Sequence, residues 1–275
     1  MVLFPNCKIN LGLHITHKRE DGYHDLETVF YPVPWQDALE GIKSGVSSGE
    51  SGVVFSTSGL AVEGNAEDNL CVKACHLLQK HHTAIGPVQL HLHKAIPMGA
   101  GLGGGSSDGA FTLTLLNQLF QLGLSHEQLL RYALELGSDC PFFILNKPLL
   151  AKGRGEKMEG IQLDLSAYSL VIVHPPVHVS TANAFKGITP RIPGRSIKTI
   201  LQQPIETWKE WLTNDFEAGL CKQYPEIEQI KESLYNYGAI YASMTGSGSA
   251  VFGIFEKNTS TSFSFPSAYR IYQPN

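Results

Sequence analysis

Residues 97–108 of the sequence read Pro-Met-Gly-Ala-Gly-Leu-Gly-Gly-Gly-Ser-Ser-Asp, and five of the seven residues at 99–105 are glycine. Glycine lets the backbone approach a ligand closely and adopt positive φ angles, so that successive amides can point at one anion. Ser106, Ser107 and Asp108 are good capping residues and precede a stretch with helical spacing. A helix start adds unpaired N–H groups and a favourable dipole. The stretch therefore predicts a phosphate-binding loop between a strand and a helix.

Other functions of this loop are less well supported. A flexible linker would not be framed by a strand and an amphipathic helix. A Walker loop requires Lys after its last glycine, where Ser106 stands. Gly99, Gly101 and Gly104 satisfy the G-x-G-x-x-G pattern of dinucleotide-binding folds, but the candidate acidic residue about twenty positions later, Glu127, belongs to a predicted helix start. A Rossmann-type NAD(P)-dependent oxidoreductase stays the alternative.

Hydrophobic periodicity predicts the elements along the chain. Alternation of polar and apolar residues is typical of strands, and apolar residues three or four positions apart are typical of helices. Ser125 and Gln128 form a capping box, and Gly137 is a natural end for the helix that follows it. The predicted strands are residues 8–16, 28–34, 53–58, 88–93, 170–174 and 250–255, the predicted helices are 68–82, 106–120, 125–137, 204–220 and 227–237, and turns are expected at 21–22 and 138–141.

The bulk composition indicates an ordinary globular protein. The 275 residues are 43% hydrophobic and 17% charged, with a net charge of −4 and scattered Lys and Arg, so nucleic acid is not an expected partner. No apolar run approaches the roughly 18 residues of a membrane span. Residues 1–13 lack the features of a signal peptide, and we expect a cytoplasmic protein. After about residue 150 the sequence changes to a pattern of strands, a Pro/Gly-rich connection and helices. This change predicts two domains, residues 1–150, which contain the phosphate loop, and residues 151–275.

Two groups of residues could bind a metal ion, but both have simpler interpretations. The five cysteines are odd in number and widely spread, which favours reduced thiols. Cys71, Cys75 and His76 lie within about one helical turn, yet no second Cys pair completes a ligand set. His91 and His93 share one face of a predicted strand, which is more typical of a solvated surface.

Taken with motifs elsewhere, the loop resembles the GHMP kinase superfamily. Within it, the pattern is similar to kinases that act on a cytidine diphosphate derivative of methylerythritol. The match is collinear over nearly the whole chain. It rests on residues 97–108 and on four further motifs, Lys8-Ile-Asn10, Asp21-Gly-Tyr-His24, Gly137-Ser-Asp139-Cys-Pro141 and Met244-Thr-Gly-Ser-Gly248.

The resemblance implies a fold, a reaction and a small-molecule substrate. The implied fold is α+β with two domains, an N-terminal one like ribosomal protein S5 domain 2 and a ferredoxin-like C-terminal one. The implied reaction is ATP- and Mg²⁺-dependent phosphorylation of the 2-hydroxyl of the methylerythritol unit, in the non-mevalonate route to isoprenoid precursors. A monomer or weak homodimer is expected. Another GHMP small-molecule kinase and a non-catalytic nucleotide-binding regulator remain open.

Site residues follow from the resemblance position by position. Asp139 is implied as the base that accepts the hydroxyl proton, and Lys8 as its charge partner. Taken alone, Asp139 would be a turn residue and Lys8 a solvated charge on a strand edge. The implied ATP-binding residues are Pro97, Met98, Gly99, Ala100, Gly101, Leu102, Gly103, Gly104, Gly105, Ser106, Ser107, Asn69 and Lys94, with Ser107 also a candidate Mg²⁺ ligand.

The implied substrate-binding residues lie far from the loop in sequence. Asn10 shares a strand face with Lys8 and is implied to bind the acceptor hydroxyls. Tyr23 and Phe185 are implied to stack on the cytosine, and His24 to bond its polar edge. Core packing is an equally simple interpretation of Phe185. The remaining residues are Gly246 and Ser247, in a Gly/Ser loop that could also be only a tight turn.

Overall fold

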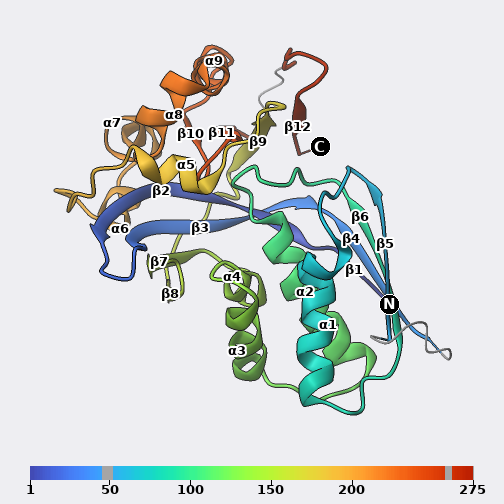
Figure 1. The fold of residues 1–275 in the computed structure, drawn as a ribbon. Coiled ribbons are helices and arrows are strands. Elements are labelled where there is room, and N and C mark those ends of the chain that lie inside the picture. Colours follow the sequence, from blue (N-terminus) through green and yellow to red (C-terminus); the bar gives the residue numbers. More distant parts are fainter. Residues whose placement is uncertain (45–51, 258–261, 275) are drawn as a thin grey trace. The chain divides into compact units, whose positions relative to one another are not determined.

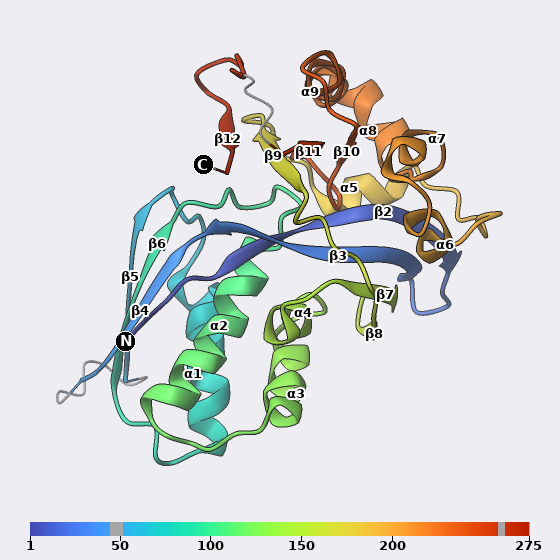
Figure 2. The same ribbon diagram turned by 180° about the vertical axis from the view of Figure 1, so that it is seen from behind.

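The computed structural model describes residues 1–44, 52–257 and 262–274, and Figures 1 and 2 show it from opposite sides. Its residues cluster into two compact units that are discontinuous in sequence. The first unit contains residues 1–7, 34–98 and 103–147, and the second contains residues 8–33, 99–102 and 148–275. The domain division at residue 150 stays a prediction, because compact units are clusters of neighbouring residues rather than domains that fold alone.

A four-stranded sheet in the order β1-β4-β6-β5 forms one layer of the first unit. β4 pairs antiparallel with β1 and β6, whereas β5 pairs parallel with β6. Helices α1 and α2 pack on each other, α1 also contacts β5, and α2 also contacts β4 (Figure 1). The bounds are β1 Val2–Leu3, β4 Ala38–Lys43, β5 Val53–Gly59, η1 Ala66–Asp68, α1 Leu70–His81, β6 Val88–Lys94, α2 Gly104–Leu119, α3 His126–Leu136 and α4 Cys140–Leu145.

Strand β6 and helix α2 hold the two ends of the glycine loop. The apolar positions Val88, Leu90 and Leu92 of β6 are buried, and they alternate with more exposed residues as a half-buried strand requires. Leu113 and Leu116 bury one side of α2. Both anchors are therefore fixed by the core of the first unit.

The second unit contains two sheets. One has the order β2-β3-β7-β8, and the other is antiparallel with the order β10-β11-β9-β12. Leu13 and Ile15 of β2 belong to the same apolar core as Phe216 and Ile227. The bounds are β2 Asn6–Lys18, β3 His24–Gln36, β7 Leu149–Gly153, β8 Lys157–Gly160, β9 Tyr168–His174, α5 Thr181–Lys186, α6 Ile197–Leu201, η2 Ile205–Thr207, α7 Trp208–Trp211, α8 Glu217–Gln223, α9 Pro225–Asn236, β10 Tyr241–Met244, β11 Val251–Glu256 and β12 Arg270–Tyr272.

Most long periodic segments form the predicted elements. The predicted strands correspond to β2, β3, β5, β6, β9 and β11, and four of the predicted helices correspond to α1, α2, α3 and α9. Ser125 and Gln128 make both bonds of the predicted capping box. No helix in the described part of the chain combines the length and apolarity needed to cross a bilayer.

Three local predictions were wrong. Helix α2 begins at Gly104, so Ser106–Asp108 lie inside it, and its N-cap is Gly103 in the left-handed conformation. The turn predicted at 138–141 covers only Ser138 and Asp139, because α4 begins at Cys140 with proline in its first turn, where the missing N–H is tolerated. The helix predicted at 204–220 is broken into η2, α7 and α8.

The break before α8 has a tertiary cause. The Leu13 amide donates to the Thr213 carbonyl at 2.9 Å, and the Asp215 amide donates to the Leu13 carbonyl at 2.9 Å. Asn214, between them, is buried and donates to the carbonyls of Met244 and Gly246, both at 2.9 Å. Pairing with β2 therefore replaces the helical hydrogen bonds at this point.

Candidate active site

The glycine loop runs from the end of β6 to the start of α2. Gly99, Gly101 and Gly103 have φ angles of 65°, 77° and 70°, in the left-handed region that L side chains rarely adopt. This conformation lets the peptide chain fold around an anion with its amides exposed. Gly103 has no side chain to cap α2, so the N–H groups of the first turn are available to a ligand.

Gly101 lies against a second glycine-containing loop, residues 245–249. A Cβ atom on Gly101 would overlap the Thr245 carbonyl oxygen, so glycine is required there for close approach. The Thr245 hydroxyl donates to the Gly101 carbonyl at 3.3 Å, and the Ala250 amide donates to the Ala100 carbonyl at 3.1 Å. Residues 99–102 and 245–250 therefore form one packed surface of the second unit.

Lys8 is buried beside this surface. Its ammonium group donates to the Asn10 side-chain oxygen at 2.6 Å and to the Gly101 carbonyl at 2.8 Å, and only 4% of the residue is exposed. The Phe30 ring centroid lies 5.3 Å from Lys8 Nζ. A cation in a place with so little water interacts strongly with any anion that approaches.

Asn10 is fixed on the same strand face as Lys8. Its side-chain N–H donates to the Thr28 hydroxyl at 2.9 Å, and its backbone amide donates to the Thr245 hydroxyl at 2.9 Å. Because the bond to Thr28 and the bond from Lys8 use opposite ends of the carboxamide, its orientation is defined. Binding of acceptor hydroxyls by Asn10 stays a prediction.

Asp139 is the half-buried N-cap residue of α4, and it has a helical φ of −85°. It belongs to the first unit, whereas Lys8 belongs to the second. Its role as the base, and its pairing with Lys8, stay predictions.

Aromatic rings gather near the β2–β3 turn. The His24 and Phe185 rings stack with centroids 4.8 Å apart, and Phe216 meets Phe185 edge-on at 4.9 Å. Tyr23 is 55% exposed, and the Arg154 guanidinium lies 4.3 Å from its ring centroid. Tyr23, His24 and Phe185 thus lie within one unit, and Arg154 is an additional residue that no sequence motif marked. Cytosine binding by these residues stays a prediction.

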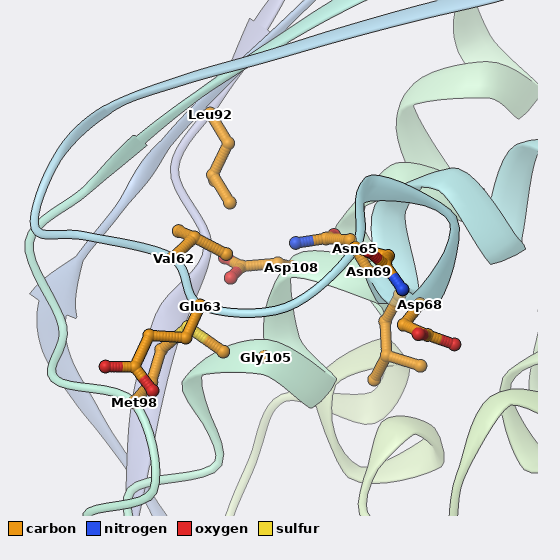
Figure 3. Close-up of a pocket in the computed structure, with 10 residues that line it drawn as sticks. Val62, Glu63, Asn65, Asp68, Asn69, Leu92, Met98, Gly105 and Asp108 are labelled. Carbon is orange, nitrogen blue, oxygen red and sulfur yellow. The ribbon is translucent and has the colours of Figure 1, made fainter.

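A pocket of about 170 Å³ opens beside the start of α2 in the first unit (Figure 3). The Asn69 side chain accepts the Cys71 amide at 2.9 Å as the N-cap of α1. Predicted residues Asn69, Met98 and Gly105 contribute to the wall. Sequence reasoning missed the other lining residues, which are Val62, Glu63, Asn65, Asp68, Leu70, Leu92 and Asp108.

Lys94 occupies a buried ionic cluster instead of the pocket wall. Its ammonium donates to a carboxylate oxygen of Asp37 and, at 2.7 Å, to Asp108 Oδ2. The other Asp37 oxygen accepts the amides of Ala95 and Ile96 at 2.6 and 2.8 Å. Burial raises the pKa of Asp108 to about 7, against the opposing effect of Lys94. The cluster anchors the start of the glycine loop, and contact of Lys94 with adenine stays a prediction.

The side chains that could ligate a metal ion are dispersed in the described part of the chain. In residues 1–44, 52–257 and 262–274, no group of three or more His, Cys, Asp and Glu side chains could hold a metal ion. Cys71 and Cys75 are buried in α1, and the Ser56 and Ser58 hydroxyls bond to the His91 ring at 2.8 and 2.9 Å. The Ser107 hydroxyl is buried without a hydrogen-bond partner among the described residues, which fits an oxygen ligand for a cation that arrives with a nucleotide.

Comparison with known proteins identifies the family. The family described as GHMP kinases N terminal domain matches residues 69–147, and GHMP kinases C terminal matches residues 196–262. A 4-diphosphocytidyl-2-C-methyl-D-erythritol kinase of Bacteroides fragilis is 52% identical over 266 residues, covering 96% of each chain. The chain belongs to the 4-diphosphocytidyl-2-C-methyl-D-erythritol kinase family of GHMP kinases.

Further relatives support the same family assignment. The enzyme of that name from Bacteroides thetaiotaomicron is 54% identical over 258 residues, which are 93% of this chain and 92% of that protein. A crystal structure of 4-(cytidine 5'-diphospho)-2C-methyl-D-erythritol kinase matches with a TM-score of 0.78 at 32% identity, covering 92% and 90% of the two chains. A mevalonate kinase structure matches with a TM-score of 0.71 at 14% identity, which indicates a shared fold. The superfamily predicted from the motifs, and its two-part α/β fold, are confirmed.

Proposed function

We propose that this protein transfers the γ-phosphate of ATP to the 2-hydroxyl of 4-diphosphocytidyl-2-C-methyl-D-erythritol, in the methylerythritol phosphate pathway of isoprenoid precursor biosynthesis. The observation that carries the proposal is the Lys8 ammonium held 2.8 Å from the Gly101 carbonyl. This hydrogen bond joins a buried cation to a glycine loop suited to phosphate. The substrate is inferred from the names of the relatives.

The nucleotide is bound by its two ends. Amides of residues 99–105 and the first turn of α2 hold the phosphates, where the helix dipole favours negative charge. The adenine enters the pocket lined by Asn69 (Figure 3). Mg²⁺ bound with ATP would neutralise charge that develops during transfer, and Ser107 is the residue that would ligate it.

The acceptor is oriented by the second unit. Asn10 bonds its hydroxyls, while Tyr23 and Phe185 stack on the cytosine and the His24 edge bonds the base. Gly246 and Ser247 contribute to the same site through the loop that contacts Gly101.

Proton removal and phosphoryl transfer follow. Asp139 accepts the proton of the 2-hydroxyl as its oxygen bonds to the γ-phosphorus, and the bond to the β,γ-bridging oxygen breaks to release ADP. Lys8 keeps the Asp139 carboxylate ionised and stabilises the developing negative charge.

One comparison of acceptors tests the proposal. Phosphate transfer from ATP is measured with the diphosphocytidyl substrate and, separately, with free methylerythritol, and ³¹P NMR locates the new phosphate. Transfer to the 2-position of the first acceptor alone is expected. Equal activity on both acceptors removes the cytosine site. Binding of NAD(P)H in place of ATP would support the oxidoreductase alternative instead.

The finer structural and cellular assignments extend this proposal. Residues 1–150 would be the domain like ribosomal protein S5 domain 2, and residues 151–275 the ferredoxin-like domain, supported by the antiparallel sheet β10-β11-β9-β12 and the neighbouring helices α8 and α9. The protein would act in the cytoplasm as a monomer or weak homodimer. Its five cysteines are odd in number and widely spread, which is consistent with a reducing compartment, and sedimentation velocity would report the oligomeric state.

A further inference from the structure

Arg154 covers one face of the Tyr23 ring. Its guanidinium carbon lies 4.3 Å from the ring centroid, inside the roughly 6 Å within which the face of an aromatic ring attracts a cation. Tyr23 is nonetheless 55% exposed. Because a ring has two faces, a base that stacks on Tyr23 without displacing Arg154 takes the face opposite the guanidinium.

The register of one sheet brings these two residues together. Tyr23 lies between β2 and β3, and Arg154 lies between β7 and β8 (Figures 1 and 2). β3 and β7 pair antiparallel, with Leu26 opposite Gly153. The two turns therefore stand at the same end of the sheet, and the contact between their side chains follows from backbone pairing.

The main chain of Arg154 is fixed by its own turn. Its amide donates to Glu156 Oε2 at 2.6 Å, and the Gly155 amide donates to the Lys152 carbonyl at 3.1 Å. Gly153 has a φ of 69°, and a Cβ atom there would meet the Glu156 carboxylate oxygens at 2.8 and 2.9 Å. The place from which the guanidinium reaches Tyr23 is therefore defined.

The turn around Tyr23 fixes its main chain. The Arg19 amide donates to the Tyr23 carbonyl at 2.9 Å, and the Tyr23 amide donates to Asp21 Oδ1 at 3.1 Å. The pKa of Asp21 is lowered chiefly by its hydrogen bond from the Arg19 side chain, and the charge of Arg154 lowers it further. Main-chain bonds alone do not fix the side-chain torsions of Tyr23, whereas a guanidinium against the ring face restricts them.

We propose that Arg154 is a positioning residue for the acceptor, which holds the Tyr23 ring so that the opposite face of the ring stacks on the pyrimidine base. This inference rests on the proposed function and deepens it, because it extends base recognition to the turn between β7 and β8. A ring ordered before binding loses less conformational freedom when the base stacks on it. Arg154 acts through Tyr23, without contact with the diphosphate of the acceptor.

Steady-state kinetics of the 275-residue protein test the positioning role. In Arg154→Met the KM for the diphosphocytidyl substrate is expected to rise at least about fivefold, because binding of the base must then order the ring. The KM for ATP and kcat are expected to stay within about twofold of wild type. Arg154→Lys keeps a cation and is expected to recover part of the loss. A KM for the acceptor at or below that of wild type in Arg154→Met overturns the inference.

Arg131→Met is the matched control. Arg131 is an exposed arginine of α3 whose guanidinium lies 3.6 Å from the Glu127 carboxylate, and it belongs to the first unit, whereas Arg154 belongs to the second. All three kinetic parameters of this variant are expected to stay within about twofold of wild type. An equal rise in the KM for the acceptor in Arg131→Met assigns the effect to loss of surface charge and overturns the inference.

A double-mutant cycle tests whether Arg154 acts through the ring. In a Tyr23→Leu background, Arg154→Met is expected to change the KM for the acceptor by less than about twofold, because the ring that it holds is gone. NMR titration with cytidine and with cytidine diphosphate separates the ring from the phosphates, and Arg154→Met is expected to weaken binding of both by a similar factor. The full effect in the Tyr23→Leu background, or a loss confined to cytidine diphosphate, indicates direct contact with phosphate and overturns the inference.

The outcomes separate the inference from the proposed function. Phosphorylation of the diphosphocytidyl alcohol by wild type, with an unchanged KM in Arg154→Met, removes the inference and leaves the function. Binding of cytidine that depends on Tyr23 and Arg154, without phosphoryl transfer from ATP, removes the function and supports the inference. Failure of the wild-type protein both to bind the two cytidine compounds and to phosphorylate the alcohol overturns both.

Discussion

The rings of His24 and Phe185 lie nearly parallel, with an interplanar angle of 18° and centroids 4.8 Å apart. They come from β3 and α5, which are far apart in the sequence. The His24 ring covers part of the Phe185 ring, and Phe216 meets Phe185 edge-on with centroids 4.9 Å apart. Under the proposed function, the remaining surface of Phe185 and the His24 ring are the groups that would contact the cytosine.

Substitution of Phe185 by alanine should weaken acceptor binding selectively. We expect the KM for the diphosphocytidyl substrate to rise roughly tenfold, since stacking of a base on an aromatic ring contributes about 1–3 kcal/mol, and the KM for ATP to change little. Phe120→Ala serves as a control, because Phe120 is also half-buried but lies at the end of α2 beside Lys43. A similar rise in KM for both variants would indicate general loss of stability.

Replacement of Asp139 by asparagine should remove the base and keep the fold. We expect kcat to fall by at least about a hundredfold with little change in KM, because proton removal occurs only in the chemical step. Circular dichroism and the thermal midpoint check folding. Near-normal turnover would exclude Asp139 from the mechanism.

Exchange of Lys8 for methionine keeps the length of the side chain and removes its charge. The Asn10 oxygen and the Gly101 carbonyl would each lose a donor. Loss of such bonds to a charged group should lower stability by about 1.5–3 kcal/mol, and kcat should fall together with it. Urea denaturation and steady-state kinetics measure the two effects, and full activity in a destabilised variant would assign Lys8 a structural role only.

Introduction of a methyl group at Gly101 should disrupt the glycine loop. Gly101 has a φ of 77°, and the new Cβ would overlap the Thr245 carbonyl oxygen. The left-handed conformation alone costs about 1–2 kcal/mol for an alanine, so we expect both lower stability and weaker ATP binding. Gly219→Ala is the control: Gly219 lies in α8 with open space around it, and alanine there should raise stability by up to about 1 kcal/mol.

Stability should depend on pH through Asp108. Burial raises the pKa of its carboxyl to about 7 in the folded protein, from its ordinary value of 3.8. Between these values the folded state binds more protons than the unfolded state, so this residue makes the free energy of unfolding decrease as pH rises toward 7.

Comparison with a variant isolates that contribution. The groups facing Asp108 are Lys94 of β6, Asp37 before β4 and Cys71 of α1. Asp108→Asn lacks the titration, so the free energy of unfolding of wild type relative to the variant should fall from pH 5 to pH 8. Urea midpoints at several pH values measure this difference, and parallel pH profiles for the two proteins would contradict it.

Local signals in the sequence predicted much of the fold. Ser125 and Gln128 sit three residues apart, so their capping box depends on almost nothing else in the chain. The start of α2 was mispredicted because Gly103 caps it through its backbone conformation, a weaker signal than the Ser side chains that follow. The break before α8 depends on pairing with Leu13, which no local pattern could reveal.

In the candidate site too, local spacing predicted some contacts, whereas contacts between distant residues were missed. The i, i+2 spacing of Lys8 and Asn10 on a strand was enough to predict a shared face, and the two side chains are in contact. Arg154 over Tyr23 and Asp37 on Lys94 join residues far apart in sequence. Such pairs depend on the path of the chain in three dimensions, so motif spacing alone does not contain them.

The Gly101 carbonyl accepts from both the Lys8 ammonium and the Thr245 hydroxyl, and Lys8 in turn orients Asn10. These polar groups are locked together before either reactant arrives. Electrostatic preorganisation of this kind leaves little reorientation for the moment of reaction. Under the proposed function, a new acceptor preference would evolve most easily through changes at Tyr23, His24 and Phe185, because such changes leave the hydrogen bonds among Lys8, Asn10, Gly101 and Thr245 intact.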